Sequence, residues 1–405
     1  MSGSATSSTA EVLTDRQFGP YFVGNLLSNS GTWFHNIAAA AAIYLATGSS
    51  LLVGLVSVLQ FIGVIVLAPF AGALTDRLDR RRLLLATQVV SFAAAATLAV
   101  GATRIDVTTD PGGVALILGA TAVLGAAHGL AMPAMGALVV NLVRDEHLET
   151  AVALSSVTFH VARALGPVAG GLTFTTFGAE TAFGVNAASF VPLIVALLKV
   201  RPRTVQKRPT GRRGLVAALR FVWRDRVSAV VLLSLAAMSF ATDPVNTLTP
   251  ALADRFGQGP AAVGEQVSAF GAGAVLVLVV LNRLGDRFGT ARAGVIGVVL
   301  VGCGMLLVAG SPNYPTALAA FALAGAGYLL GVSLLTGVLH RRLDEEMRGR
   351  VMALWSVAFL GARPVGAMVN GAMSDAFGVV VAVALAAVVA LVSLLWVAPR
   401  LWRRA

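Results

Sequence analysis

The chain has 405 residues, of which 57% are hydrophobic and only 12% are charged, and its mean hydropathy is +0.82. Soluble domains carry about 25% charged residues, so this composition excludes both a set of ordinary soluble domains and an intrinsically disordered chain. The single cysteine, Cys303, excludes an internal disulfide, a thiolate metal site and a redox pair of cysteines.

Twelve stretches are long and apolar enough to cross a bilayer as helices, since a span needs about 20 mostly apolar residues. Unbroken apolar runs such as Val275–Leu281 lack the alternation of membrane barrel strands. The predicted fold class is therefore an all-α integral membrane protein. In chain order the predicted spans are Phe18–Ala46, Leu51–Leu74, Leu83–Gly101, Gly113–Leu142, Ala151–Thr176, Thr181–Val200, Val227–Leu252, Ala261–Asn282, Ala293–Gly310, Pro315–His340, Val351–Ser374 and Phe377–Val397.

The tails and loops predict which side of the membrane each segment faces. The polar tail of residues 1–17 is not a cleavable signal peptide, because the apolar stretch after it far exceeds the roughly 7–15 residues of a signal core. Twelve spans place both termini on one side, and nearly all Lys and Arg outside the spans fall on that side. The positive-inside rule therefore predicts that both termini lie in the cytoplasm. The excess of Arg over Lys, with only Lys199 and Lys207 present, and the abundance of Ala are typical of a GC-rich bacterial genome, so a bacterial cell membrane is predicted. The net charge of +11 then reflects loops facing anionic lipid, and no nucleic acid is expected as a partner.

The longest connection divides the chain into two halves. A basic linker, 201–226, separates a predicted N-terminal six-helix bundle, 18–200, from a C-terminal six-helix bundle, 227–397, and residues 398–405 form a second cytoplasmic tail. Apolar residues among the arginines of the linker predict a short amphipathic helix on the membrane surface. This segment is either a tether between the halves or a regulatory docking site.

The two halves also repeat. Spans five and eleven share an arginine, two glycines and a Phe-Gly pair at positions 200 residues apart. So many matches in one register are not expected by chance. A parallel repeat of six plus six helices predicts a substrate site near the membrane midplane, between the halves. The matching positions are Arg163 and Arg363, Gly166 and Gly366, Gly171 and Gly371, and Phe177-Gly178 and Phe377-Gly378.

The loop after the second span, residues 72–82, reads GALTDRLDRRR. Its Asp76 can accept hydrogen bonds from the amino terminus of a neighbouring helix, where the helix dipole favours an anion. Its arginines can pair with carboxylates and lipid phosphates, and a reduced copy, LGDRFG, follows the eighth span. The alternative is a basic loop that only sets the topology. The candidate residues of a cytoplasmic gate are Gly72, Asp76, Arg77, Arg80, Arg81, Asp286 and Arg287.

Span five contains the sequence GPVAGG, with Gly166, Pro167, Gly170 and Gly171. The proline removes one backbone donor and bends the helix, and the glycines let a neighbouring helix approach closely. The alternative is ordinary packing of a glycine-rich membrane helix.

These segments together resemble the major facilitator superfamily, and within it the branch of enterobactin exporters and macrolide efflux proteins. The resemblance covers nearly the whole chain and rests on Thr47-Gly48-Ser49, loop 72–82, the GPVAGG helix and the sequence RGRVM at 348–352, in that order. It implies two pseudo-symmetric bundles that rock between inward-open and outward-open states, with loop 72–82 latching their cytoplasmic ends. It also implies that the GPVAGG helix belongs to an exporter.

Charged residues within the spans are candidates for the transport path. Arg163 and Arg363 lie near the middle of the membrane, where a charge is costly unless it meets a cavity or a partner. They either line the transport path or stabilise the packing of the helices.

Asp243 precedes Pro244, which breaks its helix as the discontinuous helices of transporters do around binding sites. A carboxylate that moves between an apolar and a charged environment can carry a proton, so Asp243 is the candidate for proton coupling. The alternatives are a carboxylate permanently paired with an arginine and one in a wet outer vestibule.

The first span is unusually polar. Asn25, Asn29 and Asn36 are separated by four and seven residues and share one helical face. This face, with His35 beside it, lines a cavity or bonds to neighbouring helices.

The sequence contains no phosphate-binding loop, no nucleophile elbow and no metal-ligand spacing, so neither an enzyme nor a cofactor is predicted. We predict a monomeric secondary transporter that exports a small amphipathic compound in exchange for protons. The alternatives are a proton-coupled or facilitative importer of a nutrient and, from another class, a membrane-embedded enzyme.

Overall fold

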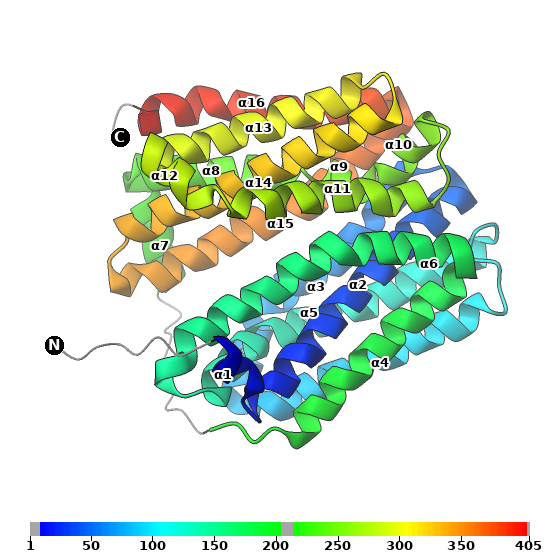
Figure 1. Ribbon diagram of the computed structural model, residues 1–405, viewed down its shortest axis with the longest axis horizontal. Helices are drawn as coiled ribbons and strands as arrows, with labels where there is room; N and C mark the ends of the chain where they lie inside the picture. The colour runs from blue at the N-terminus through cyan, green and yellow to red at the C-terminus, as the bar shows by residue number, and fades with distance from the viewer. Residues whose placement is uncertain (1–8, 204–213, 403–405) are drawn as a thin grey trace. The chain divides into compact units, whose positions relative to one another are not determined.

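The computed structural model describes residues 9–203 and 214–402, which form helices joined by short connections (Figure 1). A short α1 (Thr9–Thr14) precedes the long helices of the first half. Those helices are α2 (Phe18–Thr47), α3 (Ser50–Arg77), α4 (Arg80–Ala102), α5 (Pro111–Leu142) and, after the 3-10 turn η1 (Asp145–His147), α6 (Leu148–Lys199).

The second half begins with α7 (Gly214–Arg224) inside the region predicted as a linker. Its remaining helices are α8 (Arg226–Ala241), α9 (Pro244–Thr247), α10 (Thr249–Arg255), α11 (Ala261–Leu278), α12 (Leu281–Phe288), α13 (Thr290–Gly310), α14 (Tyr314–Arg342), α15 (Glu345–Phe377) and α16 (Val379–Trp402).

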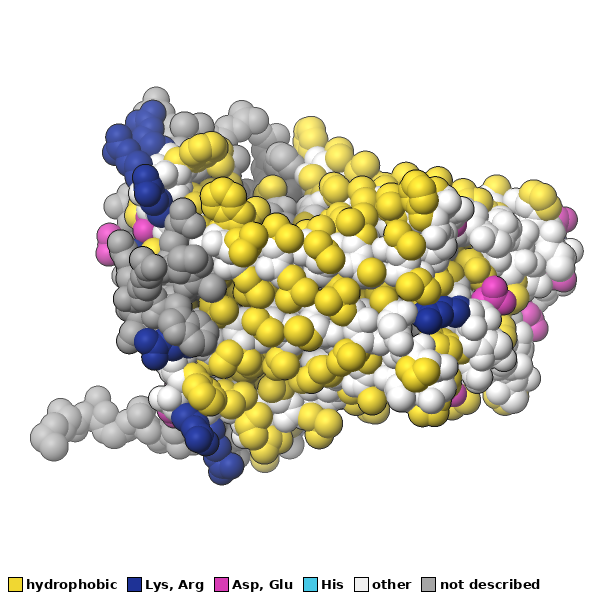
Figure 2. Space-filling view, turned by 90° about the horizontal axis from the view of Figure 1, so that it is seen from above, with side chains coloured by type: hydrophobic (Ala, Val, Ile, Leu, Met, Phe, Trp, Pro, Cys, Tyr) yellow, Lys and Arg dark blue, Asp and Glu magenta, His cyan; other side chains and the backbone are white. Residues whose placement is uncertain are grey.

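These helices account for the twelve predicted spans and confirm the all-α fold class. Within the described ranges, nine helical segments are long and apolar enough to cross a membrane on length and composition alone. The polar helices α2 and α15 are not among those nine. Figure 2 shows a face in which hydrophobic side chains cover the length of the helices, while Lys and Arg gather mainly at one end.

At two turns between consecutive spans the backbone adopts a conformation that requires glycine. Spans five and six run together as α6 and reverse direction at Gly178, where φ is 86°. Gly378 has φ of 88° and separates α15 from α16 in the same way. Because positive φ is costly for residues with a Cβ, both turns require glycine, and the repeat at an offset of 200 is thus visible in the backbone.

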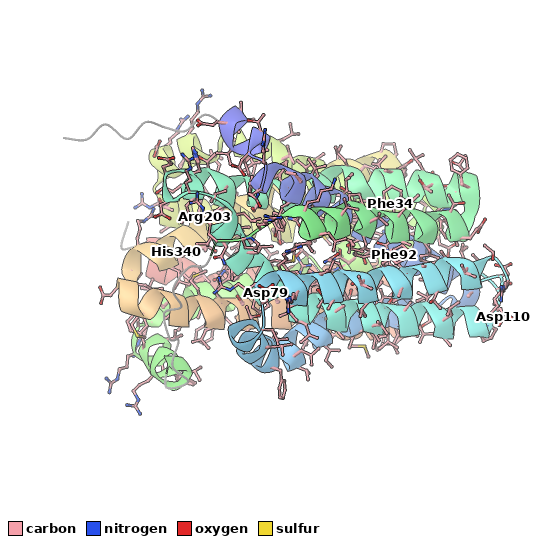
Figure 3. The ribbon with its side chains drawn as sticks, turned by 90° about the horizontal axis from the view of Figure 1, so that it is seen from below. Phe34, Asp79, Phe92, Asp110, Arg203 and His340 are labelled. Carbon is pink, nitrogen blue, oxygen red and sulfur yellow. The ribbon has the colours of Figure 1, made fainter. Side chains whose placement is uncertain are left out.

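Side-chain caps fix several helix starts. Asp79 accepts a hydrogen bond from the Arg82 amide at the start of α4, and Asp110 accepts one from the Gly112 amide at the start of α5. Such caps satisfy amide groups that have no partner within the helix. Asp79 and Asp110 mark the starts of α4 and α5, and Figure 3 shows them far from each other. The two helices pack together, so they run antiparallel.

The chain forms two compact units. The first consists of residues 1–42 and 62–207, and the second consists of residues 43–61 and 208–405. The first unit has a core of buried apolar side chains that includes Phe18, Leu138 and Leu197. The second unit contains the C-terminal helices together with Ile43–Phe61, the end of α2 and the beginning of α3.

Candidate functional site

The second unit contains a buried carboxylate, Asp243, at a break in the seventh span. Helix α8 ends at Ala241 and α9 begins at Pro244, where the sequence predicts a break because proline has no amide donor. Between them, Asp243 has only 2% of its surface exposed. A buried carboxylate is costly unless it is hydrogen-bonded or paired, so its neighbours define what it can do.

Helix α15 supplies those neighbours. The Asn370 side-chain amide donates to Asp243 Oδ2 at 3.4 Å and to the Phe240 carbonyl at 3.4 Å. Gly366, one turn earlier on α15, lies so close that an added Cβ would come within 3.1 Å of Asp243 Cβ. The Ser239 hydroxyl donates to the Phe359 carbonyl at 2.6 Å. A close crossing of α8 and α15 therefore places the carboxylate against a neutral amide.

Arg363 lies two turns before Asn370 on α15, within a group of aromatic rings. Its guanidinium carbon is 5.2 Å from the centroid of Phe61 and 5.8 Å from that of Phe359. It also donates to the Tyr328 hydroxyl at 3.4 Å. Phe359 stacks on Trp355 with centroids 5.0 Å apart. The charge predicted at mid-depth is thus held by cation–π contacts, and the ring from α3 belongs to the same compact unit.

A second carboxylate, Asp375, holds the start of α3 and was not singled out by the sequence. Its two oxygens accept hydrogen bonds from the Ser49 hydroxyl at 2.6 Å, the Ser50 amide at 2.7 Å and the Leu51 amide at 3.1 Å. The hydroxyls of Ser50 and Ser374 are 3.0 Å apart. The only local signal was a pair of serines at a helix start after Gly48, a common capping position; the partner lies more than 300 residues away.

The candidate gate loop is anchored within the first unit. Arg80 donates to the Asn141 side-chain oxygen at 3.1 Å and to the Ala137 carbonyl at 3.3 Å. Arg81 donates to the carbonyls of Leu197 and Leu198 at the end of α6. These arginines bind helix-end carbonyls, whereas the sequence predicted carboxylates and lipid phosphates as partners. The side chains of Asp76 and Arg77, and Gly72 within α3, lie outside the described residues.

The reduced copy of the loop lies on α12. Asp286 and Arg287 are both exposed there, and the Arg287 guanidinium lies 5.6 Å from the centroid of its neighbour Phe288. Neither residue takes part in an ion pair within the described part of the chain.

The polar residues of α2 bond both within the helix and to neighbouring helices. Asn25 donates to the Thr158 hydroxyl of α6 at 3.4 Å, and Asn29 donates to the Asn25 carbonyl at 2.9 Å. His35 is 1% exposed and lies 2.9 Å from the Thr121 hydroxyl of α5. Asn25 and His35 thus bond to neighbouring helices, whereas Asn29 bonds within α2.

The GPVAGG segment brings α6 against α2. A Cβ at Gly166 would come within 2.8 Å of Trp33, and one at Gly170 within 3.1 Å of the Phe34 backbone. Pro167 is buried beside them and Gly171 follows in the same helix. The side chain of Arg163, one turn earlier, lies outside the described residues.

The helices and the buried polar groups between them define a multi-pass membrane protein, and solved structures share its fold. The chain is similar to a bacterial homologue of the iron transporter ferroportin in an inward-facing state, with a TM-score of 0.71 and 17% identity over 93% of this chain and 98% of that one. It is also similar to the nucleoside transporter NupG, with a TM-score of 0.74 and 10% identity over 94% of this chain and 98% of that one.

Residues 7–401 match the family described as transmembrane secretion effector, so the chain belongs to this family of major facilitator transporters. It is 27% identical to the enterobactin exporter EntS of Shigella boydii serotype 4 over 379 residues, which cover 89% of this chain and 86% of the relative. The enterobactin exporter EntS of Escherichia coli O81 matches equally, at 27% over the same shares. The resemblance to the major facilitator superfamily is thereby confirmed: the protein is a secondary transporter for a small molecule, and its family is not a class of enzymes.

Proposed function

We propose that the protein exports a small amphipathic organic compound from the cytoplasm by alternating access, in exchange for protons that enter the cell. Similarity to enterobactin exporters over most of the chain supports the direction of transport and the chemical class of the cargo. In this proposal the transporter lies in the bacterial inner membrane with both termini in the cytoplasm, as the distribution of basic residues favours.

The observation that carries the proton coupling is the buried carboxylate of Asp243 at the break between α8 and α9. Among the described side chains, no cation lies within ion-pair distance of it. Water or a nearby cation favours the charged form of a carboxylate, whereas an apolar environment favours the acid. If the surroundings of Asp243 alternate between these two conditions during the cycle, it takes up a proton on one side of the membrane and releases it on the other.

Arg363 is the proposed partner of Asp243 in this cycle. It lies on the helix that also presents Asn370 to the carboxylate, and its guanidinium is held by rings rather than by an acid. A small shift of α15 relative to the break would bring the cation and the carboxylate together or separate them. The rings around Arg363 also provide apolar and cation–π contacts for the cargo.

The cytoplasmic latch is assigned to loop 72–82. Arg80 and Arg81 fix this loop to the ends of α5 and α6. A loop held in this way can present Asp76 and Arg77 in a constant position, and these two residues are proposed to join and release the cytoplasmic ends of the two halves, with Asp286 and Arg287 in a lesser role.

The experiment compares wild type, Asp243→Asn and Asp254→Asn. Asp254 is an exposed carboxylate on α10, just beyond the same predicted span, so its variant removes a charge without touching the break. Cells with and without the gene are tested for susceptibility to a panel of amphipathic compounds, and a protected compound is then followed in proteoliposomes with an imposed pH gradient. We expect gradient-driven transport to fall at least tenfold in Asp243→Asn and to persist in Asp254→Asn.

Exchange of labelled for unlabelled cargo without a gradient separates coupling from folding. We expect Asp243→Asn to retain this exchange, because binding and rocking do not require a net proton movement. Full gradient-driven transport in Asp243→Asn would remove Asp243 from the mechanism. Cargo that moves in the same direction as the protons would instead identify an importer.

A further inference from the structure

Helix α7 has an exposed face that combines basic and apolar side chains. Arg220 and Arg224 are one turn apart and exposed. Leu219 and Trp223, one residue before each, are 42% and 82% exposed. On a helix, residues four apart lie above one another, so a row of two arginines runs beside a row of two apolar side chains.

The opposite side of α7 packs on the protein. The helix contacts α15 and α8, and Phe221 is half-buried. The exposed rows are therefore on a helix whose position is fixed by the second unit.

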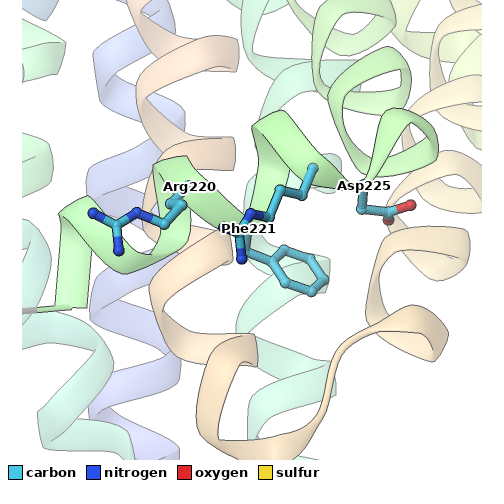
Figure 4. A pocket seen from close by; sticks show the side chains of 4 residues that line it. Arg220, Phe221 and Asp225 are labelled. Atoms are coloured by element: carbon cyan, nitrogen blue, oxygen red, sulfur yellow. The ribbon is translucent and has the colours of Figure 1, made fainter.

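The arginine row borders a hollow of about 470 Å³ lined by Arg220, Phe221, Arg224 and Asp225 (Figure 4). Asp225 does not neutralise the two arginines, because its carboxylate is already engaged. It accepts hydrogen bonds from Arg342 at 3.1 Å and from the Ser228 hydroxyl at 2.6 Å. Across the described residues, no carboxylate forms an ion pair with Arg220 or Arg224. The hollow thus keeps two positive charges available for an anion.

The position of α7 decides what kind of anion can reach the hollow. Only Asp225 separates α7 from α8, which opens a candidate membrane span at Arg226. Trp side chains favour the level of the lipid headgroups, and an exposed Leu beside Trp223 favours the edge of the hydrocarbon over bulk water.

We propose that this hollow binds the headgroup of an anionic phospholipid. Arg220 and Arg224 bind the phosphate, since guanidinium groups form paired hydrogen bonds with phosphate oxygens. Leu219 and Trp223 contact the upper part of the acyl chains. The site is independent of the transport path around Asp243.

The test uses the full-length purified protein, native mass spectrometry and lipids with matched acyl chains. Phosphatidylglycerol is the anionic probe, phosphatidylcholine is the zwitterionic probe, and inorganic phosphate is titrated separately. The test variant is R220Q/R224Q. The matched control is R16Q/R203Q, which removes the same charge from two exposed arginines outside the hollow.

We expect wild type and R16Q/R203Q to retain a phosphatidylglycerol adduct that phosphatidylcholine does not replace. R220Q/R224Q removes two basic residues that attract an anionic headgroup, so it should bind phosphatidylglycerol about tenfold or more weakly. R220K/R224K keeps the charge and should recover most of the binding. Trp223→Ala should weaken the lipid adduct and leave any binding of inorganic phosphate unchanged.

Three results would overturn the proposal. Equal phosphatidylglycerol binding by wild type and R220Q/R224Q would exclude the hollow as the site. An equal loss in R16Q/R203Q would show a diffuse charge effect. Displacement of the lipid by millimolar inorganic phosphate would identify a site for a soluble anion.

Discussion

Asp375 caps the amino terminus of α3 at Ser50, although the two residues are 325 positions apart. The carboxylate lies near the end of α15 and accepts from the Ser50 amide, while the neighbouring hydroxyls of Ser374 and Ser50 are 3.0 Å apart. Gly371 makes this approach possible, because a Cβ there would come within 2.7 Å of the Ser50 carbonyl oxygen. If transport requires α3 and α15 to separate at this point, the contact must open in every cycle.

A reversible cross-link tests whether the contact must open. In a Cys303→Ser background, S50C/S374C places two thiols where the native hydroxyls are 3.0 Å apart, a spacing that small side-chain adjustments convert into a disulfide. We expect a mild oxidant to stop transport and a reductant to restore it. Each single-cysteine variant should transport under both conditions, and undiminished transport by the cross-linked protein would show that the contact stays closed during the cycle.

Loss of the cap should favour the open form of the contact. Asp375→Asn keeps the size of the side chain but loses acceptor capacity toward the two amides and the Ser49 hydroxyl, an effect of about 1 kcal/mol. Ser50 is 1% exposed, so the labelling rate of a cysteine at this position, measured with a membrane-impermeant maleimide, reports opening. We expect labelling of S50C to be about fivefold faster with Asp375→Asn. Asp106→Asn, in the exposed loop after α4, is the control and should leave the rate unchanged.

The ion pair of Asp225 and Arg342 should make stability depend on pH. Burial alone would raise the pKa of Asp225, but hydrogen bonds from Arg342 and Ser228 and the Arg342 charge outweigh it and lower the pKa below the ordinary aspartate value. A carboxyl whose pKa is lower in the folded state stabilises the fold at neutral pH, and this contribution is lost as the pH falls through the unfolded and then the folded pKa.

Because Arg342 is 38% exposed, solvent screening limits the ion pair to less than about 1 kcal/mol. Asp225→Asn retains the helix cap on α8 and removes only the charge, so we expect the unfolding temperature to fall by about 2 °C at pH 7. The difference between Asp225→Asn and wild type should shrink as the pH falls below the ordinary aspartate pKa. Asp225→Ala also removes the cap and should be less stable than Asp225→Asn at every pH; a difference between Asp225→Asn and wild type that does not shrink with falling pH would exclude the ion pair as its cause.

The turn at Gly378 should not tolerate a side chain. Nothing lies within 4 Å of an added Cβ, but the backbone has φ of 88°. Gly378→Ala should therefore cost about 1–2 kcal/mol through the backbone alone. Gly361→Ala, within the preceding helix α15 and with equal free space and no positive φ, is the control. Equal unfolding temperatures for the two variants would contradict this reason for the glycine.

The helices were predictable because their causes are local. Runs of about 20 apolar residues mark the spans, Pro244 marks the break beside Asp243, and Gly178 marks the reversal within α6. The burial of Asp243 also follows from its place in an apolar run.

The contacts of the polar residues were not predictable in the same way. Arg81 bonds to carbonyls more than 100 positions away, and the role of Asp375 depends on which face of α15 meets α3. Small residues such as Gly371 permit such crossings but do not specify a partner, since any helix can approach a glycine. The aromatic contacts of Arg363 required the same tertiary information.

The duplicated halves have diverged at the Asp375 cap. At the offset of 200 that relates spans five and eleven, the counterpart of Asp375 is Thr175, whose hydroxyl bonds within its own helix. At the offset of 210 that relates the two Asp-Arg loops, the counterpart of Ser50 is Pro260, which precedes α11 and provides no side-chain cap. The carboxylate that joins the end of α15 to the start of α3 therefore has no equivalent at these repeat positions, and this contact distinguishes the C-terminal repeat from the N-terminal one.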